Sequence, residues 1–217
     1  MNIHSITKED YPLLMELDKK VYPTDDPVTP EIFNQWFANN PEFGILLKNE
    51  EETLGNAIII PLNKKGWEGL TTGKLLESEL NSKYIFDNTR DKELCIHIYH
   101  IEKLTKIEKF HDLILKKLQE IISSLKDTNT QLTVSGFSGL CVTSQGIGLF
   151  YNKFNCRERE FINTEVILEK NSKIKIADEE NLEELKKDLS QGWSYKNRCK
   201  MLVIYPNEFS IVWNYLK

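Results

Sequence analysis

Residues 93–154 constrain the fold most, because strand-like apolar runs alternate there with helical segments. Residues 94–101 form the first apolar run, and an amphipathic segment that ends near Leu125 follows it. Residues 131–137 form the second run, and residues 144–154 have helical spacing again. Strand, helix, strand and helix in this order predict a parallel βαβ crossover with one more helix behind it.

The segments before this stretch predict two helices and a hairpin. Residues 2–7 predict a short strand, and apolar spacing predicts a helix that starts near Asp10. Thr29 and Pro30 predict the cap and first position of a second helix. Residues 43–48 and 53–62 predict a hairpin around an acidic turn, and residues 63–92 predict short helices over the sheet. We therefore expect an α+β protein with a mixed, mostly antiparallel central sheet flanked by helices.

The C-terminal part predicts a separate unit. Residues 157–168 alternate as a last strand or hairpin arm, and residues 170–173 predict a short linker. A strand, a helix capped by Asp178 and another strand follow. We expect a main domain over 1–169 and a small strand-helix-strand appendage over 170–217. Its start is similar to residues 6–10, which allows a truncated second repeat, although two unrelated strand-to-helix junctions with similar caps explain this better.

Charge and hydropathy exclude two classes of partner. The net charge is −5, so no chain-wide basic field exists to hold a nucleic acid. No apolar run approaches the roughly 18 residues of a membrane span. The N-terminus lacks the layout of a signal peptide, so we expect a cytoplasmic protein without membrane contact.

The four cysteines are widely spaced, which favours reduced and buried thiols. Cys95, His97 and His100 could be considered as metal ligands. On a regular strand Cys95 and His97 share a face, whereas His100 points to the other. We therefore predict no metal site.

The segment from Ser144 to Cys156 is similar to a motif of a known family. Family members often carry Asn-x-x-Ala-x-x-Leu-Tyr-x-Lys-x-Gly-Phe, and Tyr151 and Lys153 match it. Together with the predicted layout of two helices, a hairpin and strand-helix-strand-helix-strand, this segment resembles the GNAT superfamily of N-acyltransferases. The resemblance covers residues 1 to about 169. It implies acetyl-CoA or another acyl-CoA as cosubstrate.

The family's phosphate-binding turn is eroded in this chain. Where the family has Arg/Gln-x-x-Gly-x-Gly/Ala, the chain has Lys106, Lys109 and His111. Thr105 and Glu108 predict a capping box at this helix start, and the lysines could hold phosphate as point charges. We expect weak or shifted CoA binding, with a helix end that contacts no cofactor as the alternative. The cofactor contacts that the resemblance implies are Ile101, Lys103, Lys106, Ile107, Lys109, Phe110, His111 and Ser144.

The resemblance also implies catalytic roles. Tyr151 would protonate the leaving thiolate, and the backbone amide near Ile101 would polarise the acyl carbonyl. His97 is the preferred base, because imidazole titrates near neutrality, and His100 stays possible. The alternatives are an ordinary amphipathic ring for Tyr151 and a hydrogen-bonded core residue for His97. The resemblance places acceptor contacts at Asp25 and Asp26, and we add Tyr99.

Two functions remain open at this level. The first is an N-acetyltransferase in which a small-molecule or protein amine attacks acyl-CoA directly. The second is a catalytically inactive GNAT-fold module for binding or regulation. The appendage could close the sheet, cover the acceptor cleft or mediate a homodimer.

Overall fold

The computed structural model describes residues 2–21, 28–50, 52–160, 165–171 and 173–216. The predicted acceptor residues Asp25 and Asp26 lie outside the described residues. All four cysteines are buried and unpaired, which confirms the expectation of buried thiols.

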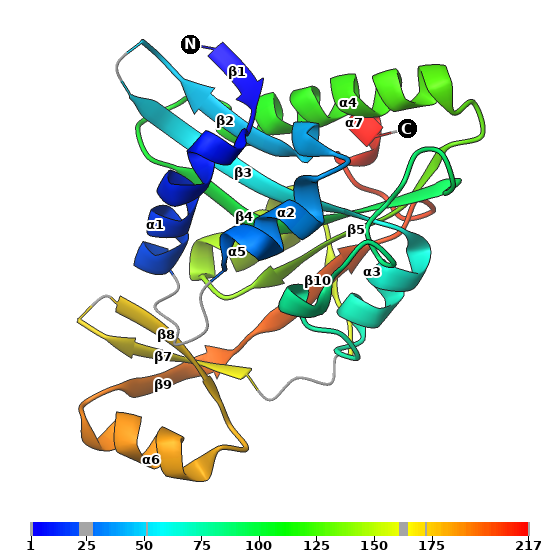
Figure 1. Cartoon of the computed structure of the whole chain (residues 1–217). Helices are drawn as coiled ribbons and strands as arrows, with labels where there is room; N and C mark the ends of the chain where they lie inside the picture. Colours follow the sequence, from blue (N-terminus) through cyan, green and yellow to red (C-terminus); the bar gives the residue numbers. More distant parts are fainter. Residues whose placement is uncertain (1, 22–27, 51, 161–164, 172, 217) are drawn as a thin grey trace.

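Most of the chain surrounds one mixed sheet of seven strands (Figure 1). From one edge to the other, the strands are β1 (Asn2–Ser5), β2 (Gly44–Lys48), β3 (Thr53–Leu62), β4 (Glu93–Lys103), β5 (Thr133–Cys141), β10 (Lys200–Ile204) and β6 (Arg157–Glu158). Only β4 and β5 are parallel among these neighbours, and helix α4 (Phe110–Thr128) is the crossover between them. The predicted α+β class with a mostly antiparallel sheet is confirmed.

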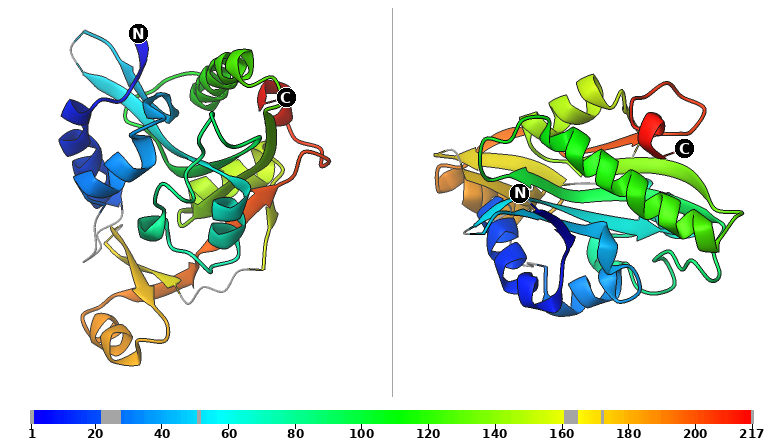
Figure 2. Two further views of the ribbon diagram at one scale, coloured as in Figure 1. Left: turned by 45° about the vertical axis from the view of Figure 1, so that its right-hand side comes forward. Right: turned by 90° about the horizontal axis from the view of Figure 1, so that it is seen from above.

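Helices cover both faces of the sheet (Figure 2). Trp67 packs directly on Gly136 of β5 on one face, whereas Phe150 packs on Gly139 on the other. Because these glycines lie three positions apart on one strand, they face opposite sides. The first face carries α1 (Tyr11–Val21), α2 (Pro30–Phe37) and α3 (Lys64–Thr71), and the second carries α4, α5 (Ser144–Gly148), a π-helical turn (Leu149–Lys153) and α7 (Trp213–Leu216).

The predicted helix cap is correct for α2 but wrong for α4. Thr29 accepts a hydrogen bond from the amide of Ile32, as predicted for the α2 cap. The predicted capping box at Thr105 is wrong, because α4 begins at Phe110. The amides of Leu104 and Thr105 instead bond to the carbonyl of Leu54, so the chain still follows the edge of β3 there.

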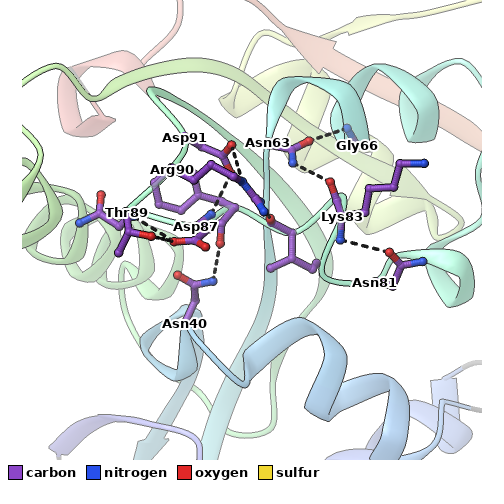
Figure 3. Close-up of polar contacts among 12 residues, drawn as sticks. Asn40, Asn63, Gly66, Asn81, Lys83, Asp87, Thr89, Arg90 and Asp91 are labelled. Carbon is purple, nitrogen blue, oxygen red and sulfur yellow. Dashed lines mark hydrogen bonds and ion pairs between the residues drawn. The ribbon is translucent and has the colours of Figure 1, made fainter.

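Polar contacts hold the segment between β3 and β4 (Figure 3). The side chain of Asn63 caps α3, and its Nδ2 donates to the carbonyl of Lys83 at 2.9 Å. From the turn after α2, Asn40 Nδ2 donates to the carbonyl of Phe86 at 2.8 Å. Both ends of this segment are therefore fixed to the body of the protein. Glu77 lies between them in a short 3-10 turn (Glu77–Glu79).

A second, smaller sheet is inserted between β6 and β10. Its strand order is β8 (Lys173–Asp178), β7 (Glu165–Lys170) and β9 (Ser194–Arg198), and α6 (Leu182–Ser190) connects β8 to β9. The predicted boundary at residue 170 therefore does not separate the two sheets. Strand β7 of the small sheet lies before this boundary, and strand β10, which lies after it, belongs to the main sheet. The predicted arm over 157–168 is likewise split between the two sheets. The physical reason is the apolar strand β10, which covers the open edge of β5 and is buried there.

The small sheet rests against the end of β5. Ile167 of β7 and Cys199 form a buried cluster with Val142, and Leu140 of β5 packs against it. The insertion thus contacts the main sheet directly beside the place where β4 and β5 separate.

Candidate active site

The parallel strands β4 and β5 part before they end. Their ladder runs from Glu93 opposite Thr133 to Ile98 opposite Gly139 and stops there, although β4 continues to Lys103. On its other edge, β5 stays paired with β10 as far as Cys141. The opening holds a cleft with a cavity volume of about 160 Å³. Pockets that enclose whole drug-sized ligands measure roughly 300–1,000 Å³, so this cleft has room for only part of such a ligand.

The walls of the cleft come from both strands and from the starts of two helices. Most of the lining residues are hydrophobic, and the polar ones include Tyr99, His111 and Gln145. The lining residues are Ile98, Tyr99, Ile101, His111, Leu140, Cys141, Val142, Thr143, Gln145, Gly146, Leu149 and Phe150.

A β-bulge at Tyr99 accompanies the separation. Ile98 is opposite Ile59 on β3 and His100 is opposite Ile58, so Tyr99 is an extra residue without a counterpart. Because the bulge shifts the alternation by one residue, His97 and His100 share a face of the sheet. The prediction that these histidines point to opposite faces is therefore wrong, since it assumed a regular strand.

His97 is fully buried under α3, and both of its ring nitrogens are engaged. Nδ1 lies 2.9 Å from Ser138 Oγ, and Nε2 lies 2.8 Å from Glu77 Oε1. Trp67 Nε1 donates to the same Ser138 Oγ at 2.8 Å. A carboxylate accepts only, so Nε2 carries the proton and Nδ1 accepts from the serine hydroxyl. This chain of donors fixes Glu77, and the histidine occupies the position of a hydrogen-bonded core residue.

Asp18 of α1 is another buried polar group on this face. The Tyr99 hydroxyl donates to Asp18 Oδ1 at 3.0 Å, and the carboxyl is only 2% exposed. Burial raises the pKa of Asp18 to about 6, while the Tyr99 hydrogen bond and the charge of His100 oppose this rise and the charge of Glu77 adds to it. Asp18 therefore does not line the cleft itself but is hydrogen-bonded to Tyr99, which does.

The start of α4 lies at the other side of the cleft. Lys109 has φ +52° in the position where the family has glycine, so the turn keeps a left-handed conformation despite its side chain. The amides of Asp112 and Leu113 bond to the carbonyl of Lys109, which makes the residues before them the free end of the helix. His111 lines the cleft, and its pKa is lowered by burial and then by Lys153 and Lys103.

The other predicted cofactor residues are dispersed. Ile101 lines the cleft, whereas Lys103 and Lys106 are exposed and Ile107 is half-buried. Phe110 is buried in the core against Gly55, so it packs the helix rather than lining the opening. Ser144 is exposed, and its neighbours at 143, 145 and 146 line the cleft in its place.

Tyr151 is held outside the cleft lining. Its hydroxyl donates to Glu158 Oε2 at 2.9 Å, and Lys200 pairs with the same carboxylate. Burial and this hydrogen bond raise the pKa of the phenol. The preceding residues, Leu149 and Phe150, line the cleft. The π-helical turn is wider than an α-helical one, so spacing counted along a regular helix does not place Tyr151.

Sequence reasoning missed Asp18, Glu77 and Ser138. Asp18 carried a usable signal, because it lies four residues after Leu14 on the apolar stripe of α1 and is buried with it. Glu77 lies in a segment with weak periodicity, and Ser138 reads as an ordinary strand residue. Their association depends on the insertion folding over β5.

Comparisons with known proteins yield structural similarities only. No protein-family model and no curated protein matches the sequence. The chain is similar to Naa50 of Arabidopsis thaliana in complex with the bisubstrate analogue CoA-Ac-MVNAL, at 9% identity over 94% of this chain and 97% of that one, with a TM-score of 0.49. It is similar to Naa20 of Chaetomium thermophilum in complex with a bisubstrate analogue, at 9% identity over 70% and 67% of the chains, with a TM-score of 0.41.

A third similar structure is the GNAT-like decarboxylase GphF in complex with isobutyryl-CoA, at 12% identity over 64% of this chain and 65% of that one, with a TM-score of 0.43. The chain thus spans about two thirds of the length of Naa20 and of GphF. Within the described ranges, no cluster of His, Cys, Asp and Glu could hold a metal ion. No helix in the described part of the chain has the length and apolar character for crossing a membrane.

Proposed function

We propose that the protein is an acyl-CoA-dependent N-acyltransferase in which an amine attacks the thioester directly. The observation that carries this proposal is the narrow cleft between β4 and β5, which has a left-handed helix start on one side and buried acid-base groups on the other. The cleft would take the thioester arm, and the free helix start would take an anionic head group.

The charges around the cleft suit coenzyme A. The free helix end at Phe110 and His111 favours an anion, and Lys103, Lys106 and Lys109 add positive charge near it. Lys153 lies close enough to lower the pKa of His111 and also pairs with Asp112 at 2.7 Å. The backbone of Ile101 would then polarise the acyl carbonyl. When bound, coenzyme A supplies the activated acyl group.

The first test is binding followed by turnover. Acetyl-CoA at 1 mM should raise the melting temperature, because a ligand that binds only the folded state stabilises it. Release of free thiol from acetyl-CoA is then measured with spermidine, tyramine and a peptide with a free N-terminus. Ile101→Trp, which fills the cleft from a lining position, is the control and should abolish the shift. An absent shift in the unaltered protein would refute the transferase.

An inactive binding module is the second candidate, and the side chain of His111 favours it. This imidazole lines the cleft at a position where the family has a small residue. A thermal shift without thiol release from any amine would support the module over the enzyme.

Tyr151→Phe tests whether this tyrosine protonates the leaving thiolate, as the resemblance implies, or only binds Glu158. Because the Tyr151 hydroxyl is bound to Glu158, we expect thiol release to change less than about threefold, within the range of surface substitutions. Steady-state turnover with saturating acetyl-CoA measures this. A loss above tenfold with an unchanged thermal shift would restore the role of thiolate proton donor that the resemblance implies.

A further inference from the structure

The bulge at Tyr99 connects the cleft to a buried acid-base pair that the resemblance did not predict. Tyr99 lines the cleft, and its hydroxyl donates to Asp18 Oδ1 at 3.0 Å. A carboxylate has about four acceptor positions on its two oxygens, and Tyr99 occupies one of them. Asp18 therefore keeps acceptor capacity for another donor.

Glu77 supplies a second carboxylate on the same face. His97 Nε2 holds its Oε1 at 2.8 Å, and the donor chain through Ser138 and Trp67 fixes that histidine. The side chain of Glu77 remains 21% exposed. Its carboxylate is therefore held by His97 near Asp18 but is still accessible.

Two buried polar groups on the same face of the sheet have no partner within the described residues. They are the side-chain amide of Asn56, at both its oxygen and its nitrogen, and the indole N–H of Trp36. Asn56 is opposite Glu102 and lies two positions from Ile58, the partner of His100, so these residues share the α1–α3 face of the sheet. The ring of Trp36 packs on Tyr99 with centroids 5.0 Å apart. Buried polar groups are normally hydrogen-bonded, so these groups point to a polar occupant of this region.

We propose that Asp18, oriented by the Tyr99 hydroxyl, takes the proton from the acceptor amine, and that Glu77 is the fixed anion that draws a positively charged amine to it. This inference rests on the proposed transferase function and assigns the base and the acceptor charge class within it. It gives His97 a positioning role, because Nε2 holds Glu77 while Nδ1 is bound to Ser138 and fixes the ring.

The step balances without another reagent. Asp18 takes the first proton from the ammonium, which frees the nitrogen lone pair. That lone pair forms the new C–N bond, the C–S bond breaks, and its electron pair leaves on sulfur. The acylated nitrogen then loses its second proton and the thiolate gains one, both through water. Asp18 releases its proton to bulk water, so the net products are an amide, a thiol and one free proton. The charged groups that face Asp18 are His100 on β4 and Glu77 on the insertion, and burial sets the carboxyl's pKa near neutrality.

The test uses the whole chain with acetyl-CoA and the best amine among spermidine, tyramine and a free peptide. Asp18→Asn should lower kcat at pH 8 at least 100-fold, keep the thermal shift with acetyl-CoA, and remove the acid limb of the pH profile near pH 6. Asp188→Asn is the matched control, because Asp188 is also a buried aspartate but pairs with Lys175 on the small sheet. It should stay within threefold.

Tyr99→Phe gives a second test through the pH profile, which would not change if Tyr99 and Asp18 only stabilised the fold. Loss of its hydrogen bond should shift the acid limb upward by about one pH unit, because the bond stabilises the ionised carboxylate. An unaltered protein that binds no acetyl-CoA overturns the proposed function and this inference with it. An active enzyme whose Asp18→Asn variant keeps its turnover and acid limb overturns the inference alone.

Discussion

Ser138→Ala is expected to lower the free energy of unfolding by about 2–5 kcal/mol, although it removes a single oxygen atom. Ser138 Oγ accepts from Trp67 Nε1 and bonds to His97 Nδ1, and all three residues are buried. The alanine leaves two polar groups unpaired in the core, each at a cost of about 1–3 kcal/mol. Urea unfolding followed by tryptophan fluorescence measures the change.

Two variants control for this prediction. Ser135→Ala lies on the same strand but is only half-buried, and should change stability by about 0.5 kcal/mol or less. Trp67→Phe combined with Ser138→Ala removes donor and acceptor together, so the double variant should lose less than the sum of the single ones. Strict additivity would show that the serine and the indole are not energetically coupled.

His111→Gly is expected to tighten binding of acetyl-CoA about tenfold, a gain rather than a loss. The imidazole lines the cleft beside the helix end, and its removal lets a ligand approach the backbone closely. The substitution removes no positive charge near pH 7.5, so the gain in affinity is not offset by a lost attraction to the ligand's phosphates. Burial and the neighbouring Lys153 and Lys103 lower the pKa of His111, so its ring is neutral there. Isothermal titration calorimetry gives the dissociation constant.

His111→Phe distinguishes bulk from chemistry at the same position. It keeps a ring in the cleft and should show no gain in affinity. If the glycine variant binds acetyl-CoA more weakly than the unaltered protein, the imidazole contacts the ligand favourably and the eroded turn is an adaptation rather than an obstruction.

Local chemistry made much of the fold predictable. Thr29 and Pro30 predicted the start of α2, and the apolar runs around the acidic turn predicted β2 and β3 within one residue. The crossover from β4 to β5 followed from periodicity. These features depend on residues close together in the sequence, where propensity and spacing carry the information.

The candidate site was harder to predict because it depends on distant segments. A bulge at Tyr99 changes which side chains share a face, and no residue type in the strand indicates it. The pair of Asp18 and Tyr99 joins positions 81 residues apart, and Ser138 and Trp67 are 71 apart. The motif match at Tyr151 indicated the correct helix but not the direction of the ring, because the π-helical turn alters the spacing.

The insertion between β6 and β10 affects how the chain can be synthesised and divided. Strand β5 lies in the middle of the main sheet, yet the strand on its outer side is made only after residue 199. During translation the hydrogen-bonding edge of β5 therefore stays open until residues 200–204 have emerged from the ribosome. A gene fragment that stops before β10 leaves this edge free to pair with another copy, which makes truncation a route to aggregation rather than to a minimal domain.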